Sequence, residues 1–272
     1  MSFIKRLKGT KIAGFFKQSA GNVWYPVIAF SWWLSKKLVP RRTVNFDTFR
    51  FSLSCTNWIT HFRWYTFKTK EPETIYFLDN YLKEKDTFVD IGANVGVFSI
   101  YAAKRFKSIN VISFEPEASN LAILKQNIVE NNLTDKIIIY GVGLSDRVGL
   151  SKLHLQDFTS GAALHSESNV SIERSVEGGN PILWAEGIYT VTLDYFREHL
   201  EVFPNVLKID TDGSEYKILL GAKELLRNPE LRAIIIEMPV YQFEECKSIL
   251  EDSGFIKTEH DFPNTRNEIW TK

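Results

Sequence analysis

The segment Thr87–Ile100, TFVDIGANVGVFSI, constrains the fold more than any other part of the chain. An apolar strand pattern ends near Asp90 and runs into a turn that contains Gly92 and Gly96, and a helical pattern follows. Glycine has no Cβ, so the backbone can turn sharply at these positions and approach a ligand closely. A strand, a glycine-containing turn and a helix in this order predict a nucleotide-type site at the carboxyl edge of a parallel sheet.

Strand and helix patterns alternate from Thr74 onward, which predicts a doubly wound, mostly parallel α/β sheet of the Rossmann-like type. Parallel strands are expected at residues 87–91, 110–115, 136–141, 205–210 and 232–237, and helices at 74–83, 96–106, 117–131, 214–227 and 241–252. The last segments, 254–260 and 266–272, are typical of a closing antiparallel hairpin across Pro263 and Asn264. Together these elements predict a seven-stranded sheet.

One long stretch, residues 150–188, interrupts this alternation and is rich in Ser, Gly, Asn and Glu. Loops of this length in a compact domain are either functional or disordered. We interpret the stretch as an irregular insert that covers the substrate or sets specificity.

Residues 1–70 are interpreted as a basic, aromatic extension that precedes a domain at residues 71–272. Residues 1–46 contain nine Lys and Arg residues and no acid, around the apolar stretch Val23–Leu34. Twelve residues are too few to span a bilayer, which needs about 20. Two interpretations remain: a peripheral anchor on an anionic inner membrane face, or a helical layer that packs on the domain or on a second subunit of a homo-oligomer.

The composition bears on two questions: whether the protein binds nucleic acid, and whether its compartment is reducing. The whole chain has 33 basic and 33 acidic residues, which argues against nucleic acid as the main partner. Its two cysteines, Cys55 and Cys246, lie far apart in the sequence, so we expect buried free thiols and a cytoplasmic protein.

The residues around the glycine turn select among nucleotides. A dinucleotide fingerprint needs glycines where this chain has Asn94 and Val97, which disfavours an NAD-linked reductase, and no P-loop is present in the sequence. Asp90, two residues before Gly92, would repel a pyrophosphate and attract a cationic ligand with an amino group. Glu115 lies 23 positions after Gly92 at the next strand end, where an acid suits the two ribose hydroxyls.

Short blocks along the chain together resemble the FkbM-type methyltransferases, which use S-adenosylmethionine (SAM). The blocks are KEPET (70–74), DIGANVG (90–96), FEP (114–116), GLSD (143–146), VTLD (191–194), KIDTDGSE (208–215) and IIIE (234–237). Many members have KIDVEG where this chain has Thr211 and Asp212, a shorter acid. The resemblance implies a SAM-dependent O-methyltransferase that acts on glycans or secondary metabolites.

The expected SAM-binding residues follow the strand ends. Asp90 and the turn amides would hold the methionine end, or Asp90 would instead brace the turn; Glu115 would take the ribose, or cap the next helix. The full set is Glu73, Asp90, Gly92, Ala93, Asn94, Gly96, Glu115, Pro116, Gly143, Leu144, Ser145 and Asp146. Ser145 and Asp146 are predicted at the adenine edge, unless they form only a turn.

The expected catalytic residues are acids at two neighbouring strand ends. Asp210 and Asp212 follow one strand and Glu237 ends the next, while Lys208 shares a face with Asp210. An acceptor hydroxyl must lose a proton, so the acids predict either a base with its partner Lys208 or an Mg²⁺ or Ca²⁺ site. Asp212 with Glu215 also fits a capping box for the following helix.

Further candidates lie outside these strand ends. His154 and His165 lie at or within the insert, where a histidine base could reach an acceptor. Arg63, Trp64 and Tyr65 are expected to stack on a sugar or simply to pack. The preferred function is methyl transfer to a sugar hydroxyl of a glycan or glycolipid precursor; the alternatives are a small-metabolite or polyketide hydroxyl, and a non-catalytic SAM-binding protein.

Overall fold

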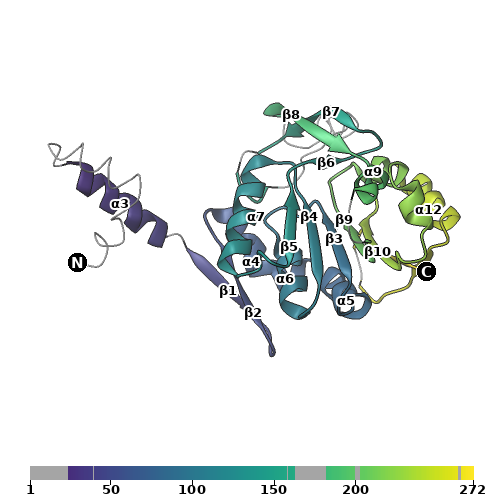
Figure 1. The fold of residues 1–272 in the computed structure, drawn as a ribbon, viewed down its shortest axis with the longest axis horizontal. Helices are drawn as coiled ribbons and strands as arrows, with labels where there is room; N and C mark the ends of the chain where they lie inside the picture. Colours follow the sequence, from purple (N-terminus) through teal and green to yellow (C-terminus); the bar gives the residue numbers. More distant parts are fainter. Residues whose placement is uncertain (1–23, 39, 158, 163–181, 200–202, 263–264) are drawn as a thin grey trace. The chain divides into compact units, whose positions relative to one another are not determined.

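The computed structural model describes residues 24–38, 40–157, 159–162, 182–199, 203–262 and 265–272. The chain divides into two units, residues 1–40 and residues 41–272. In the first unit, helix α3 spans Trp24–Leu38. All the other described helices and strands belong to the second unit (Figure 1). No helix within the described ranges is both long and apolar enough to cross a bilayer.

The second unit is built on a seven-stranded sheet in the order β11-β12-β10-β9-β3-β4-β5. Five strands run parallel: β3 (Thr87–Ile91), β4 (Asn110–Phe114), β5 (Ile137–Tyr140), β9 (Val206–Ile209) and β10 (Ala233–Glu237). The sheet closes with the antiparallel hairpin of β11 (Ile256–Thr258) and β12 (Asn267–Thr271). The predicted Rossmann-like sheet with a terminal hairpin is therefore confirmed.

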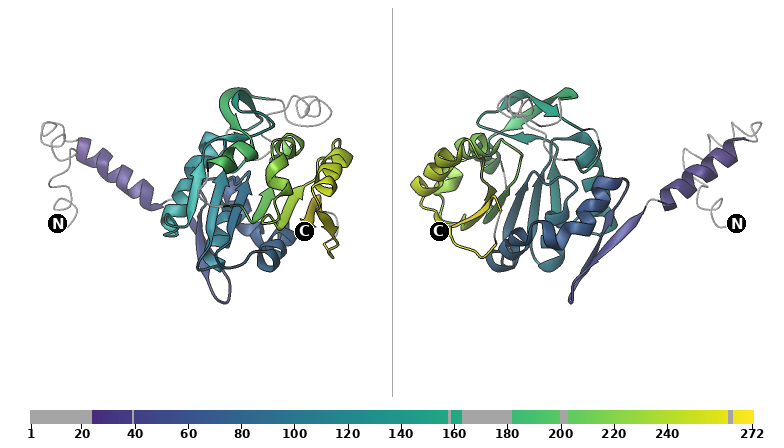
Figure 2. Two further views of the ribbon diagram at one scale, coloured as in Figure 1. Left: turned by 45° about the vertical axis from the view of Figure 1, so that its right-hand side comes forward. Right: turned by 180° about the vertical axis from the view of Figure 1, so that it is seen from behind.

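Buried residues of the strands alternate between two hydrophobic layers, so both faces of the sheet are covered (Figure 2). Phe88 belongs to the layer that packs against α5 (Pro72–Tyr81), α6 (Val97–Arg105) and α7 (Ala118–Glu130). Val89 belongs to the layer that packs against α9 (Leu193–Glu198), α10 (Glu215–Leu220), α11 (Lys223–Arg227) and α12 (Phe243–Asp252). The predicted doubly wound arrangement results directly from this alternation.

The prediction of one helix over 214–227 is wrong, because α10 and α11 are separate. The break falls at Gly221, where the backbone passes so close to the Ser145 carbonyl that an added Cβ would overlap it. Glycine allows this approach but weakens a helix.

Strands β3 and β9 are neighbours at the centre of the sheet, although more than 100 residues separate them in the chain. The chain runs outward through β4 and β5 and then returns to β9 and β10, so the strand order reverses between β3 and β9. Connections leave in opposite directions at such a switch point and open a crevice at the carboxyl ends of the strands.

Residues 41–70, which the sequence pattern groups with the extension, belong to the compact second unit. They form the hairpin β1 (Arg41–Asn45) and β2 (Arg50–Ser54), followed by α4 (Trp58–Lys70). Val44, Phe51 and Phe67 are buried in the same layer as α5, α6 and α7. These apolar anchors place the start of the compact unit near Arg41.

The insert is more regular than predicted. Strands β7 (Gly149–Leu155) and β8 (Trp184–Val191) pair antiparallel, and β6 (Gly143–Leu144) joins them in a three-stranded sheet. Leu153, Leu155 and Ile188 form a small core under this sheet. The expectation of an irregular stretch over all of 150–188 is therefore wrong at both ends, while residues 163–181 lie outside the described part.

Candidate active site

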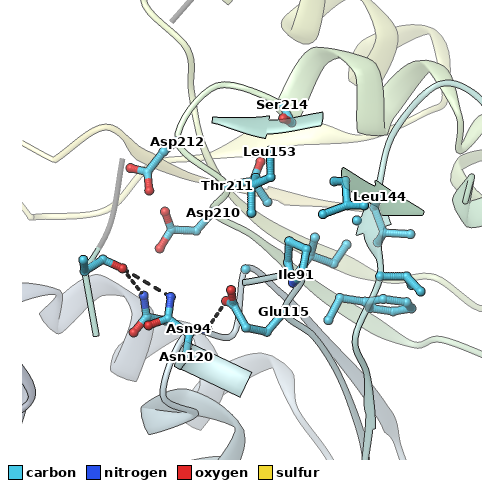
Figure 3. A pocket seen from close by; sticks show the side chains of 17 residues that line it. Ile91, Asn94, Glu115, Asn120, Leu144, Leu153, Asp210, Thr211, Asp212 and Ser214 are labelled. Carbon is cyan, nitrogen blue, oxygen red and sulfur yellow. Dashed lines mark hydrogen bonds between the residues drawn. The ribbon is translucent and has the colours of Figure 1, made fainter. Parts of the chain in front are cut away.

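A cavity lies at the carboxyl ends of β3, β4 and β9 (Figure 3). Apolar side chains form much of the wall, and polar groups approach from the strand ends. The lining residues are Ile91, Gly92, Asn94, Phe114, Glu115, Pro116, Asn120, Val142, Gly143, Leu144, Leu153, Ala162, Ile188, Asp210, Thr211, Asp212 and Ser214.

The glycine turn brings two strand ends into direct contact. Gly92 has φ +76°, and an added Cβ would overlap the backbone carbonyl oxygen of Asp210. Asn94, two residues further along the turn, also has a positive φ of 51°. Gly96, with φ +85°, precedes α6, and an added Cβ there would meet Leu124. Gly92 therefore allows a close approach at the cavity, whereas Gly96 serves helix packing.

Glu115 lines the cavity and is almost fully buried. Its Oε2 accepts a hydrogen bond from the Asn94 N–H at 2.7 Å, and its Oε1 accepts one from the Glu117 N–H at 3.0 Å. Burial raises the pKa of Glu115 to about 7, although these bonds favour the ionised form. The following helix is capped by Glu117 and not by Glu115, so the carboxylate of Glu115 belongs to the cavity wall.

A wider cleft adjoins the cavity and shares Gly92, Asn94, Asp210 and Asp212 with it. Further residues of this cleft come from α4, the start of α5, the glycine turn, α6, strands β9 and β10, and the closing hairpin. They are Arg63, Thr69, Lys70, Glu71, Pro72, Glu73, Ala93, Val97, Phe98, Lys208, Glu237, Phe262, Thr265, Arg266 and Asn267.

Lys208 is a buried cation between two acids. Its Nζ donates a hydrogen bond to Asp210 Oδ2 at 3.0 Å and lies 3.7 Å from Asp90 Oδ1. Asp90 and Lys208 are register partners on β3 and β9, which explains why they meet. Burial works to lower the pKa of Lys208, but the charges of Asp210 and Asp90 outweigh it and raise that pKa. Lys208 is therefore a fixed positive charge.

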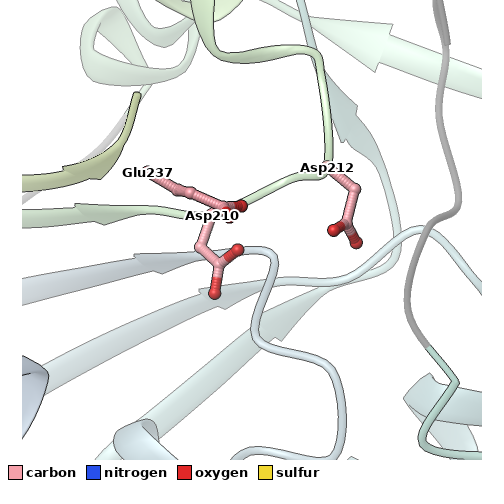
Figure 4. A group of neighbouring side chains, drawn as sticks. All are labelled: Asp210, Asp212 and Glu237. Atoms are coloured by element: carbon pink, nitrogen blue, oxygen red, sulfur yellow. The ribbon is translucent and has the colours of Figure 1, made fainter. Parts of the chain in front are cut away.

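Asp210, Asp212 and Glu237 gather at the adjacent strand ends, with carboxylate oxygens within 4.8 Å of one another (Figure 4). Burial would raise the pKa of Asp210, but Lys208 outweighs it and holds that pKa below its ordinary value. Burial and the Asp210 charge raise the pKa of Glu237 to about 8, against an ion pair with Arg266. The cluster thus combines an Asp210 whose pKa is lowered with a Glu237 whose pKa is raised.

The start of α5 supplies two further acids to the cleft. Glu73 Oε1 accepts hydrogen bonds from Thr265 Oγ1 and Asn267 Nδ2, both at 2.7 Å, so it is tied to the closing hairpin. Glu71 pairs with Lys70 through Oε1, but its buried Oε2 has no hydrogen-bond partner among the described residues. A buried carboxylate oxygen left open in this way suits a cationic amino group.

Four expected cofactor contacts, Asp90, Gly96, Ser145 and Asp146, line neither the cavity nor the cleft. Asp90 is buried behind the turn, where its Oδ2 accepts a hydrogen bond from Ser99, so it braces the turn. Ser145 is buried and Asp146 is exposed, and neither lines the cavity. The preceding segment, residues 142–144, lines it instead.

Asn120 is a cavity residue that the sequence patterns did not indicate. Its Oδ1 accepts a hydrogen bond from the Gly161 N–H at 2.6 Å, and the Ala162 carbonyl accepts bonds from Asn94 Nδ2 and Asn120 Nδ2 at 2.8 and 3.3 Å. Arg63 Nε also donates to the Gly161 carbonyl at 2.6 Å. One end of the insert is therefore fastened to the turn. Asn120 lies in the first turn of the helix that follows the strand-end acid Glu115. That position is the feature of the sequence from which it could have been identified as a cavity residue.

The remaining candidate residues do not line the cavity or the cleft, or lie outside the described residues. His154 lies on β7 and lines neither the cavity nor the cleft, and His165 lies outside the described residues. Trp64 is partly buried and donates from Nε1 to the Thr43 carbonyl, whereas Tyr65 is exposed. Cys55 and Cys246 are free and buried, as expected.

The fold and the site define a SAM-dependent methyltransferase of the Rossmann-like class. A model of the methyltransferase FkbM domain matches residues 90–257, which is more than half of the chain. The chain belongs to the FkbM methyltransferase family, and SAM is its methyl donor.

Curated relatives include further methyltransferases. Methyltransferase 1 of Beauveria bassiana (strain ARSEF 2860) is 25% identical over 186 residues, which are 62% of this chain and 72% of the relative. Hexuronic acid methyltransferase AglP of Haloferax volcanii is 27% identical over 169 residues, 62% of each chain. Among solved structures, precorrin-6y C5,15-methyltransferase from Geobacter metallireducens GS-15 aligns with a TM-score of 0.44 and 12% identity, over 75% of this chain and 90% of that one.

Proposed function

We propose that the protein transfers the methyl group of SAM to a hydroxyl of a sugar in a glycan or glycolipid precursor. The observation that carries the proposal is the acidic cleft beside the cavity, where an ionised Asp210 is held by Lys208. An alcohol needs such a proton acceptor before it can be methylated. The name of the relative AglP, a hexuronic acid methyltransferase, supports a saccharide acceptor.

The residues present fit SAM. Glu115 faces the cavity with a carboxylate for the ribose hydroxyls, the apolar walls suit a flat adenine, and the open Oε2 of Glu71 suits the amino group. When bound, SAM supplies an electrophilic methyl group. The backbone of Gly92 and Asn94 borders both the cavity and the cleft, so it would position the cofactor between them.

In this proposal Asp210 accepts the proton of the acceptor hydroxyl. Lys208 fixes the orientation and charge of Asp210, and the side chain of Glu237 hydrogen-bonds to it. The same acids are also candidates for an Mg²⁺ or Ca²⁺ site. The ammonium of Lys208 and the guanidinium of Arg266 already supply positive charge to the cluster, which supports the base over the metal.

A direct test offers methyl-labelled SAM and a panel of acceptors to the full chain. The panel contains lipid-linked saccharides, free sugars including uronic acids, and small phenolic or polyketide alcohols. Labelled, base-stable methyl ethers on a saccharide are expected. Labelling of the small alcohols alone would instead identify a small-metabolite enzyme, and SAM binding with no labelled product would support a non-catalytic protein.

The raised pKa of Glu115 predicts pH-dependent SAM affinity. Ribose hydroxyls donate to the ionised carboxylate, so affinity should increase by about tenfold from pH 6 to pH 8, as the group with pKa about 7 loses its proton. In the ligand-free protein the same shift contributes stability that is lost as pH rises from 4.5 to about 7. Calorimetric titration with SAM across this range measures the effect.

Glu115→Gln is the matched control, because it keeps the shape and removes the titration. Its SAM affinity should be weak and nearly independent of pH. An unchanged pH slope in this variant would show that another group is responsible, and wild-type affinity would remove Glu115 from the ribose site.

A further inference from the structure

Charge is distributed very unevenly along this neutral chain. The first 70 residues contain 13 Lys and Arg residues against one acid, Asp47, and so carry +12. The rest of the chain therefore carries −12. Part of the positive segment is β1, β2 and α4, so the compact second unit itself carries Arg41, Arg42, Arg50, Arg63, Lys68 and Lys70 in one stretch.

Helix α4 presents aromatic rings to solvent on one side. Trp58, Phe62 and Tyr65 are exposed by 75%, 41% and 74%, and their spacing of four and three residues places them on one helix face. The opposite side of α4 buries Thr60 and Phe67. Soluble domains rarely expose large rings in a contiguous row, so this aromatic face indicates an interaction surface.

Basic groups accompany these rings. No acid occurs in α4, and its last turn contains Lys68 and Lys70. On the neighbouring strand β1, Arg42 is exposed, and its guanidinium lies 5.8 Å from the centre of the Trp64 ring. Tryptophan and tyrosine beside lysine and arginine are typical of protein surfaces that lie at the boundary of a lipid bilayer.

The first unit carries the same combination independently. Helix α3 has no acid, and Val27, Ile28, Phe30 and Leu38 are each more than half exposed. Its 15 residues extend about 22 Å, shorter than the roughly 30 Å hydrocarbon core. A helix of this length and composition lies in the interface rather than across it.

We propose that the aromatic face of α4 and helix α3 dock the enzyme on an anionic membrane surface. Exposed aliphatic side chains on α3 favour lipid over nucleic acid, because a polyanion offers them no apolar contact. Basic residues provide attraction to anionic headgroups, and the rings enter the headgroup region. The proposal does not depend on the identity of the methyl acceptor.

Docking through α4 would bring the acceptor cleft to the membrane. Arg63, Thr69 and Lys70 of α4 line the cleft, while the aromatic face of the same helix is exposed. An acceptor held at the membrane by its own lipid could therefore enter the cleft without leaving the bilayer. This step rests on the proposed function, and it selects lipid-linked acceptors over free sugars.

Vesicle flotation with the full chain tests the docking. At about 0.1 M salt, roughly tenfold more wild-type protein should float with vesicles that contain about 30% anionic phospholipid than with neutral vesicles. High salt should reduce this flotation. Trp58→Ser with Tyr65→Ser should weaken flotation about tenfold while SAM binding and thermal midpoint stay unchanged. The control is Trp184→Ser, which removes an exposed ring on β8 and should float as wild type.

Several results would overturn the proposal. One is absence of flotation on anionic vesicles, and another is flotation that Trp58→Ser with Tyr65→Ser leaves unchanged. Concentration-dependent dimerisation that the same double substitution abolishes would make a second copy of the chain the partner. Flotation with no methyl transfer to any saccharide would leave the docking intact and remove only the proposed acceptor.

Discussion

Replacing Gly92 by alanine is expected to destabilise the protein by about 3 kcal/mol and to abolish SAM binding. A left-handed backbone costs a residue with a Cβ about 1–2 kcal/mol, and forcing atoms into a packed site costs about 1–3 kcal/mol more. Gly92 has φ +76°, and its added Cβ would overlap the Asp210 carbonyl oxygen. Chemical denaturation and SAM titration measure the two effects.

Gly254→Ala provides the matched control. Gly254 also has a positive φ, +85°, but an added Cβ has open space around it among the described atoms. This substitution should therefore cost only the backbone contribution of about 1–2 kcal/mol and should leave SAM binding intact. Equal destabilisation by both substitutions would contradict the close approach of β3 and β9 at the cavity.

The second large effect is expected from Asp210→Asn, which should lower kcat about 100-fold or more. The substitution keeps the size of the side chain and removes the proton acceptor beside Lys208. SAM affinity should change much less, because the cavity walls remain. Single-turnover methyl transfer separates this loss of chemistry from a loss of binding.

Two controls define the origin of that loss. Asp86→Asn removes a different acid, which is paired with Arg232 at 2.6 Å and lines neither the cavity nor the cleft, so turnover should persist despite some loss of stability. Loss of wild-type activity in EDTA and its recovery with Mg²⁺ would reassign Asp210, Asp212 and Glu237 to a metal. Near wild-type turnover of Asp210→Asn would exclude both roles.

The sheet could be predicted from the sequence because short local patterns are enough to identify its strands and helices. Apolar runs such as those ending at Ile91 and Ile209 are bounded by turn residues, and the helices between them show helical spacing. The strand-end acids Glu115 and Asp210 follow from the same rule, since carboxyl ends of parallel strands meet at one edge. Local sequence patterns are therefore sufficient to identify the cavity residues that lie at strand ends.

Contacts between distant segments could not be predicted in this way. Whether Asp90 points to the cavity or behind the turn depends on its pairing with Lys208 across 118 positions of sequence. The contact of Gly161 with Asn120 and Arg63 depends on how the insert folds back. The strands β7 and β8 were missed because a composition rich in polar residues hid the alternation of Leu153 and Leu155.

The pairing of Asp90 with Lys208 links catalytic activity to the correct alignment of β3 and β9. Strand side chains alternate between faces, so a slip of one residue between β3 and β9 would carry Lys208 and Asp210 together to the opposite face of the sheet from Asp90. A refolded molecule with every helix formed but these two strands misaligned would hold its base away from the glycine turn. Turnover recovered during refolding would therefore measure the fraction of molecules in which β3 and β9 have their native register. Circular dichroism cannot detect this difference, because the secondary structure is the same.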